Sequence, residues 1–293
     1  MQKNQFYNQP INKAFSLAAA TAASLLLFSF LGAPFVRVLA HTVRSSFFWA
    51  VGIVLVSTLF VFNLSTTSVY VGAIWMTLGF YSELEKRGLS WKKIAPLALF
   101  TGLIFATGLF AYLSKGSVES EIVKSVVDPL ILTLKKLFPE QSYTAENILP
   151  YMPGAFLSVL LSALAVSFIF ESNVFRLFNL KREKRVVSIR WLEFKLPDLF
   201  IWVALMSFFF SMVGVGIPQV KLIAINATVV CLVAFFFQGI ANVEFFARVY
   251  RVGVFTKAAI YMMIFAWLGP LISLIGLVDY WIDFRKILRK KLK

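Results

Sequence analysis

The sequence predicts an all-α integral membrane protein, a helical bundle of roughly seven or eight membrane segments with an amphipathic helix on its outer surface. Two observations carry this prediction. First, 59% of the 293 residues are hydrophobic and 16% are aromatic, 32 of them Phe, and the mean hydropathy is +0.80. Second, long apolar runs alternate with short polar segments along the chain. A soluble domain could not cover so much apolar surface, so we expect the lipid bilayer to be the main partner.

The charge and the few reactive residues narrow the class further. The formal net charge is +15, but the 29 Lys and Arg residues cluster at predicted helix ends and in the tail. This is the pattern of cytoplasmic loops in membrane proteins, and it does not indicate a nucleic-acid partner. Cys231 is the only cysteine and His41 the only histidine, so we expect no metal site, disulfide or cofactor. The sequence contains no nucleophile with a matching base and no phosphate-binding glycine loop, which indicates that the chain is not an enzyme.

The amino-terminal half contains four apolar runs. The first could be a signal peptide, but it is long and further membrane segments follow, which favours a retained helix. Within it, Ala14, Ala18 and Ala22 recur every four residues. Small residues at this spacing permit close approach of a partner helix, although alanine is also simply a good helix former. The runs are Ala14 to Leu31, Phe47 to Leu64, the shorter Val69 to Tyr81, and Ile94 to Leu113.

Residues 115–146 have a different character, with four basic and five acidic side chains. Apolar residues recur at four-residue spacing from Ile122 to Phe138, which predicts an amphipathic helix that lies on the outer membrane surface and bends at Pro129. It would be a lid over an external opening or, more simply, a surface connector.

The carboxyl-terminal half contains four more runs within what we expect to be a single domain of residues 1–293. Residues 176–197 form the clearest cytoplasmic loop, because residues 176–195 carry seven basic and only two acidic side chains. A second basic segment, 285–293, closes the chain. The runs are Ile148 to Phe170, Leu199 to Val213, Ile217 to Arg251, and Ala258 to Val278.

The positive charges give inconsistent counts of membrane crossings. One crossing between Arg251 and the basic tail would place the two on opposite sides of the membrane. Either the break at Gly269 and Pro270 makes this segment re-entrant, or one basic cluster lies outside. The amino-terminal end has the same problem, with a break at Gly32 and Pro34.

The run from Ile217 to Arg251 is interrupted by four polar residues, Asn226, Gln238, Asn242 and Glu244. Gln238 and Asn242 are four residues apart, on one face of a helix. Polar groups in lipid must face protein or a water-filled cavity, so we interpret these four residues as a candidate substrate-binding seam. Hydrogen bonds between helices, typically worth about 0.6 to 2 kcal/mol, would also explain them.

A compact polar motif follows the last apolar run, with Asp279, Asp283 and Arg285. On a continuous helix the two aspartates share a face, and Asp283 can pair with Lys286. These acids could bind a cation or relay protons. Ion pairs that fix the helix end are the more common outcome, and we favour them.

The chain resembles a known family at three places: Pro197 with Asp198 before a span, Gln238 with Gly239 and Asn242, and the closing segment from Gly276 to Lys286. Together these are similar to the YybS-like family of bacterial multi-pass membrane proteins, a family of unknown function. That family is grouped with the substrate-binding S components of energy-coupling-factor vitamin transporters. The resemblance implies that the alanine face would meet a membrane coupling subunit served by ATPases. The outer insert and the larger number of spans depart from the usual S component.

Three functions remain open from the sequence. We favour a substrate-binding, S-component-like transporter subunit for a small molecule, in the inner membrane of a bacterium. The alternative is a non-catalytic scaffold of a membrane complex, which would use the alanine face and the loop 176–195. The third is a membrane enzyme acting on lipid through Asp279, Asp283 or Glu244, which has the weakest support.

Overall fold

The structure is a computed structural model that describes residues 11–137, 142–180, 191–213 and 216–291. Every regular element in these ranges is a helix, and the chain divides into two compact units, residues 1–187 and 188–293, which are described separately. Five helical stretches are long and apolar enough to cross a membrane, and two shorter helices are also apolar. The fold class is therefore confirmed as helical, while the count of seven or eight segments stays a prediction. The long stretches are Asn12–Thr42, Trp91–Ser114, Ala145–Leu177, Pro218–Val249 and Phe255–Ile282, and the shorter helices are Ser45–Val61 and Asp198–Val213.

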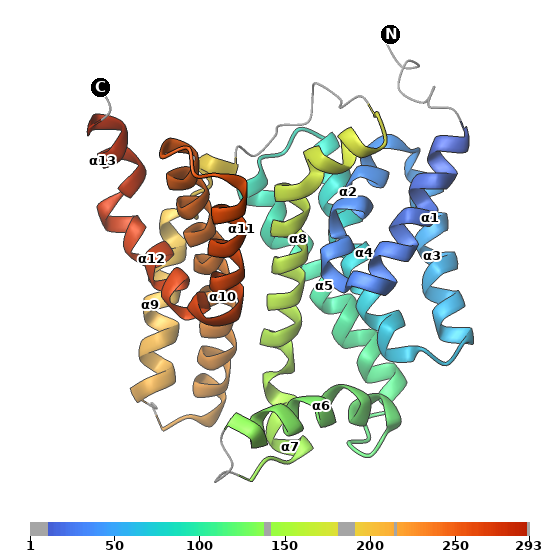
Figure 1. Ribbon diagram of the computed structural model, residues 1–293. Helices are drawn as coiled ribbons and strands as arrows, with labels where there is room; N and C mark the ends of the chain where they lie inside the picture. Colours follow the sequence, from blue (N-terminus) through green and yellow to red (C-terminus); the bar gives the residue numbers. More distant parts are fainter. Residues whose placement is uncertain (1–10, 138–141, 181–190, 214–215, 292–293) are drawn as a thin grey trace. The chain divides into compact units, whose positions relative to one another are not determined.

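The first unit contains eight α-helices within its described residues and two short 3-10 segments (Figure 1). Pro34 and Pro153 lie in the first turn of their helices. Backbone N–H groups in that turn have no partner within the helix, so the N–H that proline lacks costs no hydrogen bond. The elements are α1 Ile11–Phe28, η1 Ser29–Gly32, α2 Ala33–Thr42, α3 Ser45–Val61, α4 Ser65–Lys86, α5 Trp91–Ser114, α6 Glu121–Leu137, α7 Ala145–Ile148, η2 Leu149–Tyr151 and α8 Met152–Leu177.

The first apolar stretch is a bent pair of helices. Ser29 has a φ of 56°, and Gly32 lies so close to the backbone of Ser24 and Leu25 that a Cβ there would overlap it. The chain therefore turns back after α1, and α2 returns alongside it (Figure 1). With 10 residues, α2 is only about 15 Å long, half of a membrane crossing. This geometry fits a re-entrant amino-terminal pair. Arg37 and His41 lie between the first two apolar runs, which predicts a connector, but the structure places both in α2.

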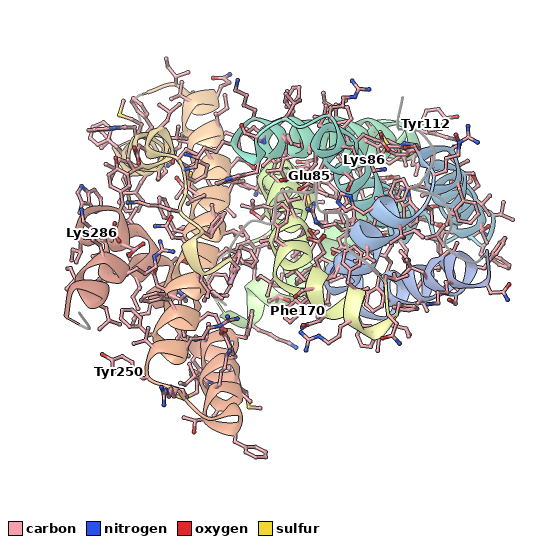
Figure 2. The ribbon with its side chains drawn as sticks, turned by 90° about the horizontal axis from the view of Figure 1, so that it is seen from above. Glu85, Lys86, Tyr112, Phe170, Tyr250 and Lys286 are labelled. Atoms are coloured by element: carbon pink, nitrogen blue, oxygen red, sulfur yellow. The ribbon has the colours of Figure 1, made fainter. Side chains whose placement is uncertain are left out.

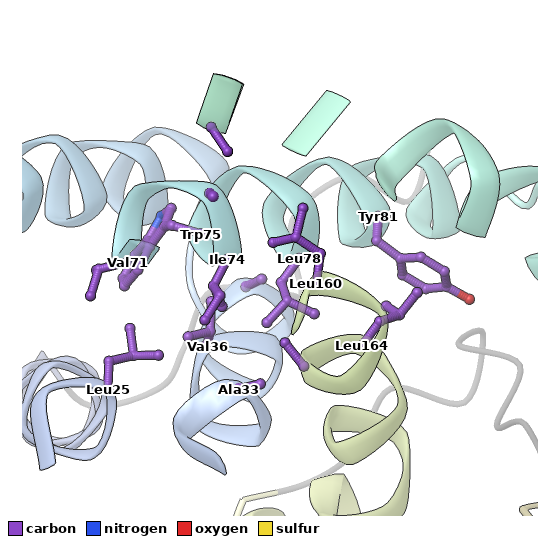
Figure 3. Close-up of a cluster of buried hydrophobic side chains, with 14 of the residues drawn as sticks. Leu25, Ala33, Val36, Val71, Ile74, Trp75, Leu78, Tyr81, Leu160 and Leu164 are labelled. Atoms are coloured by element: carbon purple, nitrogen blue, oxygen red, sulfur yellow. The ribbon is translucent and has the colours of Figure 1, made fainter. Parts of the chain in front are cut away.

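Helix α4 forms the centre of the first unit. It is longer than the run from Val69 to Tyr81 suggested, because Ser65 to Ser68 belong to its first turn and the tight turn is confined to residues 62–64. Its buried side chains meet residues of α1, α2 and α8 in a continuous apolar core (Figure 3). Val71, Ile74 and Leu78 are each fully buried there.

Helix α6 is amphipathic, as the sequence predicts, but its inner face differs in detail. Ile122, Val123 and Val127 are buried, whereas Leu130 is 41% exposed. Pro129 lies inside the helix and ends this buried stretch. Phe138 is outside the described residues. The placement of α6 on the outer membrane surface remains a prediction.

The second unit contains the last helices of the chain. Helices α9 and α10 form an antiparallel hairpin, and with 32 residues α10 is about 48 Å long, more than a bilayer core requires (Figure 1). The elements are η3 Trp191–Glu193, α9 Asp198–Val213, α10 Pro218–Val249, α11 Val254–Met263, the π-helical segment η4 Ile264–Leu268, α12 Gly269–Ile282 and α13 Phe284–Lys291.

The last apolar stretch is bent at the predicted break. Segment η4 precedes Gly269 and Pro270, and a π turn with a proline is a common cause of a sharp kink. In Figure 1, α11 runs back beside α10, the chain bends at η4, and α12 leads toward the end where α10 finishes. This arrangement fits the re-entrant alternative, with both basic clusters of this unit at one end.

Helices α10 and α12 cross in close contact through two glycines. A Cβ at Gly239 would overlap the carbonyl oxygen of Ile272, and a Cβ at Gly276 would overlap that of Phe235. Only glycine permits backbones to approach this closely.

Candidate functional site

A charged cluster is buried in the first unit, at the shared end of α2, α4 and α8. Arg37 of α2 donates from Nη2 to Glu85 Oε2 at 2.7 Å and from Nε to Glu171 Oε2 at 3.0 Å. His41, one turn after Arg37, places Nε2 3.2 Å from Glu85 Oε2. Figure 2 shows the position of Glu85 on α4 from above. One guanidinium therefore links two carboxylates from two other helices.

Aromatic rings enclose this cluster. The guanidinium carbon of Arg37 lies 4.5 Å from the ring centre of Phe168 and 5.1 Å from that of Tyr81, and Arg37 is only 1% exposed. Such stacking stabilises a buried guanidinium. Arg37 Nη1, His41 Nδ1 and Tyr81 Oη are buried without a hydrogen-bond partner among the described residues. The cluster therefore combines charges that are paired with one another and polar atoms that make no hydrogen bond among the described residues.

Sequence reasoning missed this cluster. From the sequence, Arg37 and His41 are expected on a connector, and Glu171, which directly follows the run that ends at Phe170, is expected at the membrane interface. The structure corrects both assignments, since Glu171 is 4% exposed and pairs with Arg37. The available signal was an arginine and a glutamate inside long apolar stretches, where charges must be paired.

In the second unit, Gln238 of α10 holds three segments together. Its Oε1 accepts from the backbone N–H of Leu196, and its Nε2 donates to the carbonyl of Gly276, both at 3.0 Å. Nε2 also donates to Asp279 Oδ2 at 3.3 Å. This is the interhelical hydrogen bonding that the sequence left open for Gln238.

The closing motif extends the same network. Arg285 Nη2 donates to Asp279 Oδ2 at 2.9 Å, and Nη1 donates to the carbonyls of Leu192 and Phe194. Asp283 does not share a helix face with Asp279, because it ends α12 in the left-handed region with a φ of 48°. It instead accepts from the backbone N–H of Lys286. The aspartates therefore fix the helix end, the interpretation we favoured.

Glu244 belongs to a separate group at the turn between α10 and α11. Its carboxylate accepts from Arg248 Nε at 2.9 Å, from Lys257 Nζ at 2.6 Å and from Tyr261 Oη at 2.6 Å. These contacts anchor α11 to α10, so Glu244 and Gln238 do not line one seam.

The two asparagines of the predicted seam differ from each other. Asn226 is half-buried and donates to the carbonyl of Leu222 within its own helix. Asn242 is fully buried, one turn beyond Gln238, and neither its Oδ1 nor its Nδ2 has a hydrogen-bond partner among the described residues. An unmade hydrogen bond of a buried amide costs about 1 to 3 kcal/mol. Asn242 is thus the seam residue whose polar atoms the described fold does not use.

The alanine face lies mainly inside the first unit. Ala18 is 8% exposed within the core, and Ala14 is half-buried against it. Ala22 is also half-buried. A contact of this face with a partner stays a prediction, and most of the basic loop proposed as a second contact surface is outside the described residues.

The bent helices, the glycine crossing and the buried polar groups define a polytopic helical membrane protein with ionisable side chains inside its bundle. The chain belongs to the family described as predicted membrane protein (DUF2232), whose model matches residues 15–280. No curated protein and no solved structure matches it.

Proposed function

We propose that the protein is a membrane-embedded binding subunit of a transport system, in the inner membrane of a bacterium, and that it holds a small polar molecule at Asn242. The observation that carries the proposal is the fully buried carboxamide of Asn242, whose two polar atoms lack a hydrogen-bond partner among the described residues. Ionisable and polar side chains inside membrane helices are expensive and commonly mark substrate or ion pathways.

The contacts next to Asn242 hold its helix face in a fixed position. Gln238, one turn earlier, is fixed by Leu196, Gly276 and Asp279, so the helix face that carries Asn242 is held rigidly. The bend at η4 adds a discontinuous helix, a feature of membrane transport sites near the middle of the bilayer. Rigid support keeps the unpaired amide from turning to a protein partner.

The chemistry of the amide suggests the class of ligand. A carboxamide offers an acceptor oxygen and two donor hydrogens side by side. The complementary ligand presents a donor next to an acceptor, as an amide or a nitrogen heterocycle does. Vitamin-like heterocycles fit this description, and energy for uptake would come from a separate ATPase partner, since the sequence has no phosphate-binding loop.

The other two functions have less support. Asp279 and Glu244, which an acid–base enzyme would need, are engaged by Arg285 and Lys257. A scaffold would need a free alanine face, but Ala18 lies in the core of its own unit.

The test is purification of the tagged protein in mild detergent, followed by mass spectrometry of the retained small molecules and proteins. We expect one retained metabolite, reduced about tenfold or more in Asn242→Leu, because loss of 1.4 kcal/mol already weakens binding tenfold. Thr228→Val is the matched control on the same helix, since the Thr228 hydroxyl donates to the carbonyl of Ala224. Co-purification of a coupling subunit with ATPases would support transport.

Equal retention in both variants would contradict the site. Recovery of cell-envelope proteins alone, without a metabolite, would contradict the transport proposal and favour the scaffold.

A further inference from the structure

The charged cluster of the first unit has an uneven balance of charge. Arg37 contributes one positive charge, and Glu85 and Glu171 contribute two negative charges, so the three sum to −1 when His41 is neutral. Their side chains are between 1% and 7% exposed. A net charge in such an apolar setting is unfavourable, and one added proton would remove it.

We propose that His41 is the site of this proton, and that the first unit contains a proton-binding centre formed by His41, Glu85, Arg37 and Glu171. Glu85 Oε2 lies 3.2 Å from His41 Nε2, which is ion-pair distance, so a protonated imidazole would pair with this carboxylate. Neither ring nitrogen of His41 has a hydrogen-bond partner among the described residues, so the lone pair of the neutral imidazole is available for the incoming proton.

The charged groups that act on His41 belong to this cluster: Glu85 of α4, Glu171 of α8, and Arg37, which lies one turn earlier on α2. The other packed elements add no nearby charge: η1 and α3 have no charged residue, and the single one in α1, Lys13, is exposed. Burial and the guanidinium of Arg37 disfavour the imidazolium, whereas the two carboxylates favour it.

A proton fits this centre better than a metal cation does. The Arg37 guanidinium lies between the carboxylates and would repel a sodium ion placed there, whereas the imidazole nitrogen accepts a proton without displacing any contact. In the proposed binding subunit this centre would make ligand binding sensitive to pH, while the ATPase partner supplies the energy for uptake. That use rests on the proposed function, but proton uptake by His41 does not.

His41 is the only histidine in the chain, which makes the test direct. The full chain is labelled with ¹⁵N-histidine, purified with a histidine-free tag, reconstituted in lipid nanodiscs and titrated by NMR. We expect one imidazole signal that converts between its neutral and charged forms within the titrated range of about pH 4 to 9.

Two glutamates of α4 provide a matched pair of variants. Glu85→Gln removes the carboxylate beside His41, so we expect the conversion to occur at a pH lower by about one unit or more. Glu83→Gln is the control, because Glu83 accepts from Ser45 and Lys86 and does not contact the cluster. If Glu85→Gln does not fold, Glu171→Gln shifts the conversion in the same direction.

No conversion between about pH 4 and 9 would overturn the proposal, as would an unchanged midpoint in a folded Glu85→Gln or Glu171→Gln variant. A midpoint that depends on sodium concentration would indicate a metal-cation site instead. The titration needs no small-molecule ligand, so its failure is distinguishable from failure of the Asn242 site.

Discussion

Two buried polar residues, Arg37 and Asn242, differ in how far their polar atoms are paired within the fold. Arg37 is paired with two carboxylates and stacked on two aromatic rings. Removing one partner of such a buried pair commonly destabilises a protein by about 3 to 5 kcal/mol, because the other charge remains buried. The polar atoms of Asn242, in contrast, have no hydrogen-bond partner among the described residues, and this difference is the basis of the binding proposal.

This contrast predicts opposite effects on stability within one helix. Asn242→Leu in ligand-free protein should leave the unfolding temperature unchanged or raise it, because no hydrogen bond is lost and a desolvated amide is removed. Gln238→Leu should destabilise the protein by about 1 to 3 kcal/mol, because Leu196 N–H and Asp279 lose a partner. Thermal unfolding in detergent, followed by Trp fluorescence, measures both. Equal destabilisation by the two substitutions would show that Asn242 has a structural partner.

At the scale of elements, the helices of both units depend on tight crossings and on bends. Gly239 and Gly276 bring α10 and α12 into backbone contact, and this contact aligns Gln238 with the carbonyl of Gly276. Buried polar bonds of this kind form only when the backbones are close. The crossing thus positions the face that carries Asn242.

Substitution of these glycines tests the crossing. Gly276→Ala should force α12 away from Phe235, weaken the Gln238 bonds and destabilise the protein by about 1 to 3 kcal/mol, as overpacked cores do. Gly108→Ala on α5 is the control, because nothing lies near its added Cβ. It should stabilise the helix by up to about 1 kcal/mol. Denaturation midpoints of the two variants in the same detergent provide the comparison, and a neutral Gly276→Ala would refute the close contact.

At the scale of the whole molecule, some lysines, such as Lys115 and Lys221, are scattered, but each unit also has a group of basic residues at one end. In the first unit these are the turn after α4 and the end of α8, with Lys86, Arg87 and Arg176. In the second unit they are the turn after α10 and the segment after α12, with Arg251 and Lys286. For each unit taken by itself, the positive-inside rule predicts that this end faces the cytoplasm if the suspected break in that unit forms a re-entrant pair.

Cysteine accessibility tests this orientation in a Cys231→Ser background, which lacks the native cysteine. Tyr250→Cys and Lys286→Cys should both resist a membrane-impermeant maleimide in intact cells and react after permeabilisation, because they flank a re-entrant pair. Gln219→Cys, at the opposite end of α10, should react in intact cells. Opposite behaviour of positions 250 and 286 would show that residues 255–282 cross the membrane once.

Much of the fold was predictable from the sequence. Apolar runs without water around them must satisfy every backbone group internally, so composition and run length determine helices and their approximate bounds. Run length failed where polar residues began or ended a helix, as at Ser65 and Glu85 of α4, because a buried helix in a bundle tolerates polar residues that protein partners satisfy.

The candidate sites were predictable only in part. The polar residues of α10 stand out in the sequence, because hydrocarbon excludes them. Their division into Gln238 with Asp279, Glu244 with Lys257, and an unpaired Asn242 depends on the turn after α10, which returns α11, and on the bend at η4, which returns α12.

The sequence by itself determined the class of this protein: a basic, helical membrane protein whose chain breaks at Gly32 and at Gly269. The tertiary structure alone decided that Arg37, His41, Glu85 and Glu171 meet, since they come from helices separated by up to 134 positions along the chain. The physical reason is that the hydrogen bonds of a helix join residues close together in the sequence, so the local sequence predicts the helix. A buried charge must instead be paired, and its partner can come from any helix of the bundle.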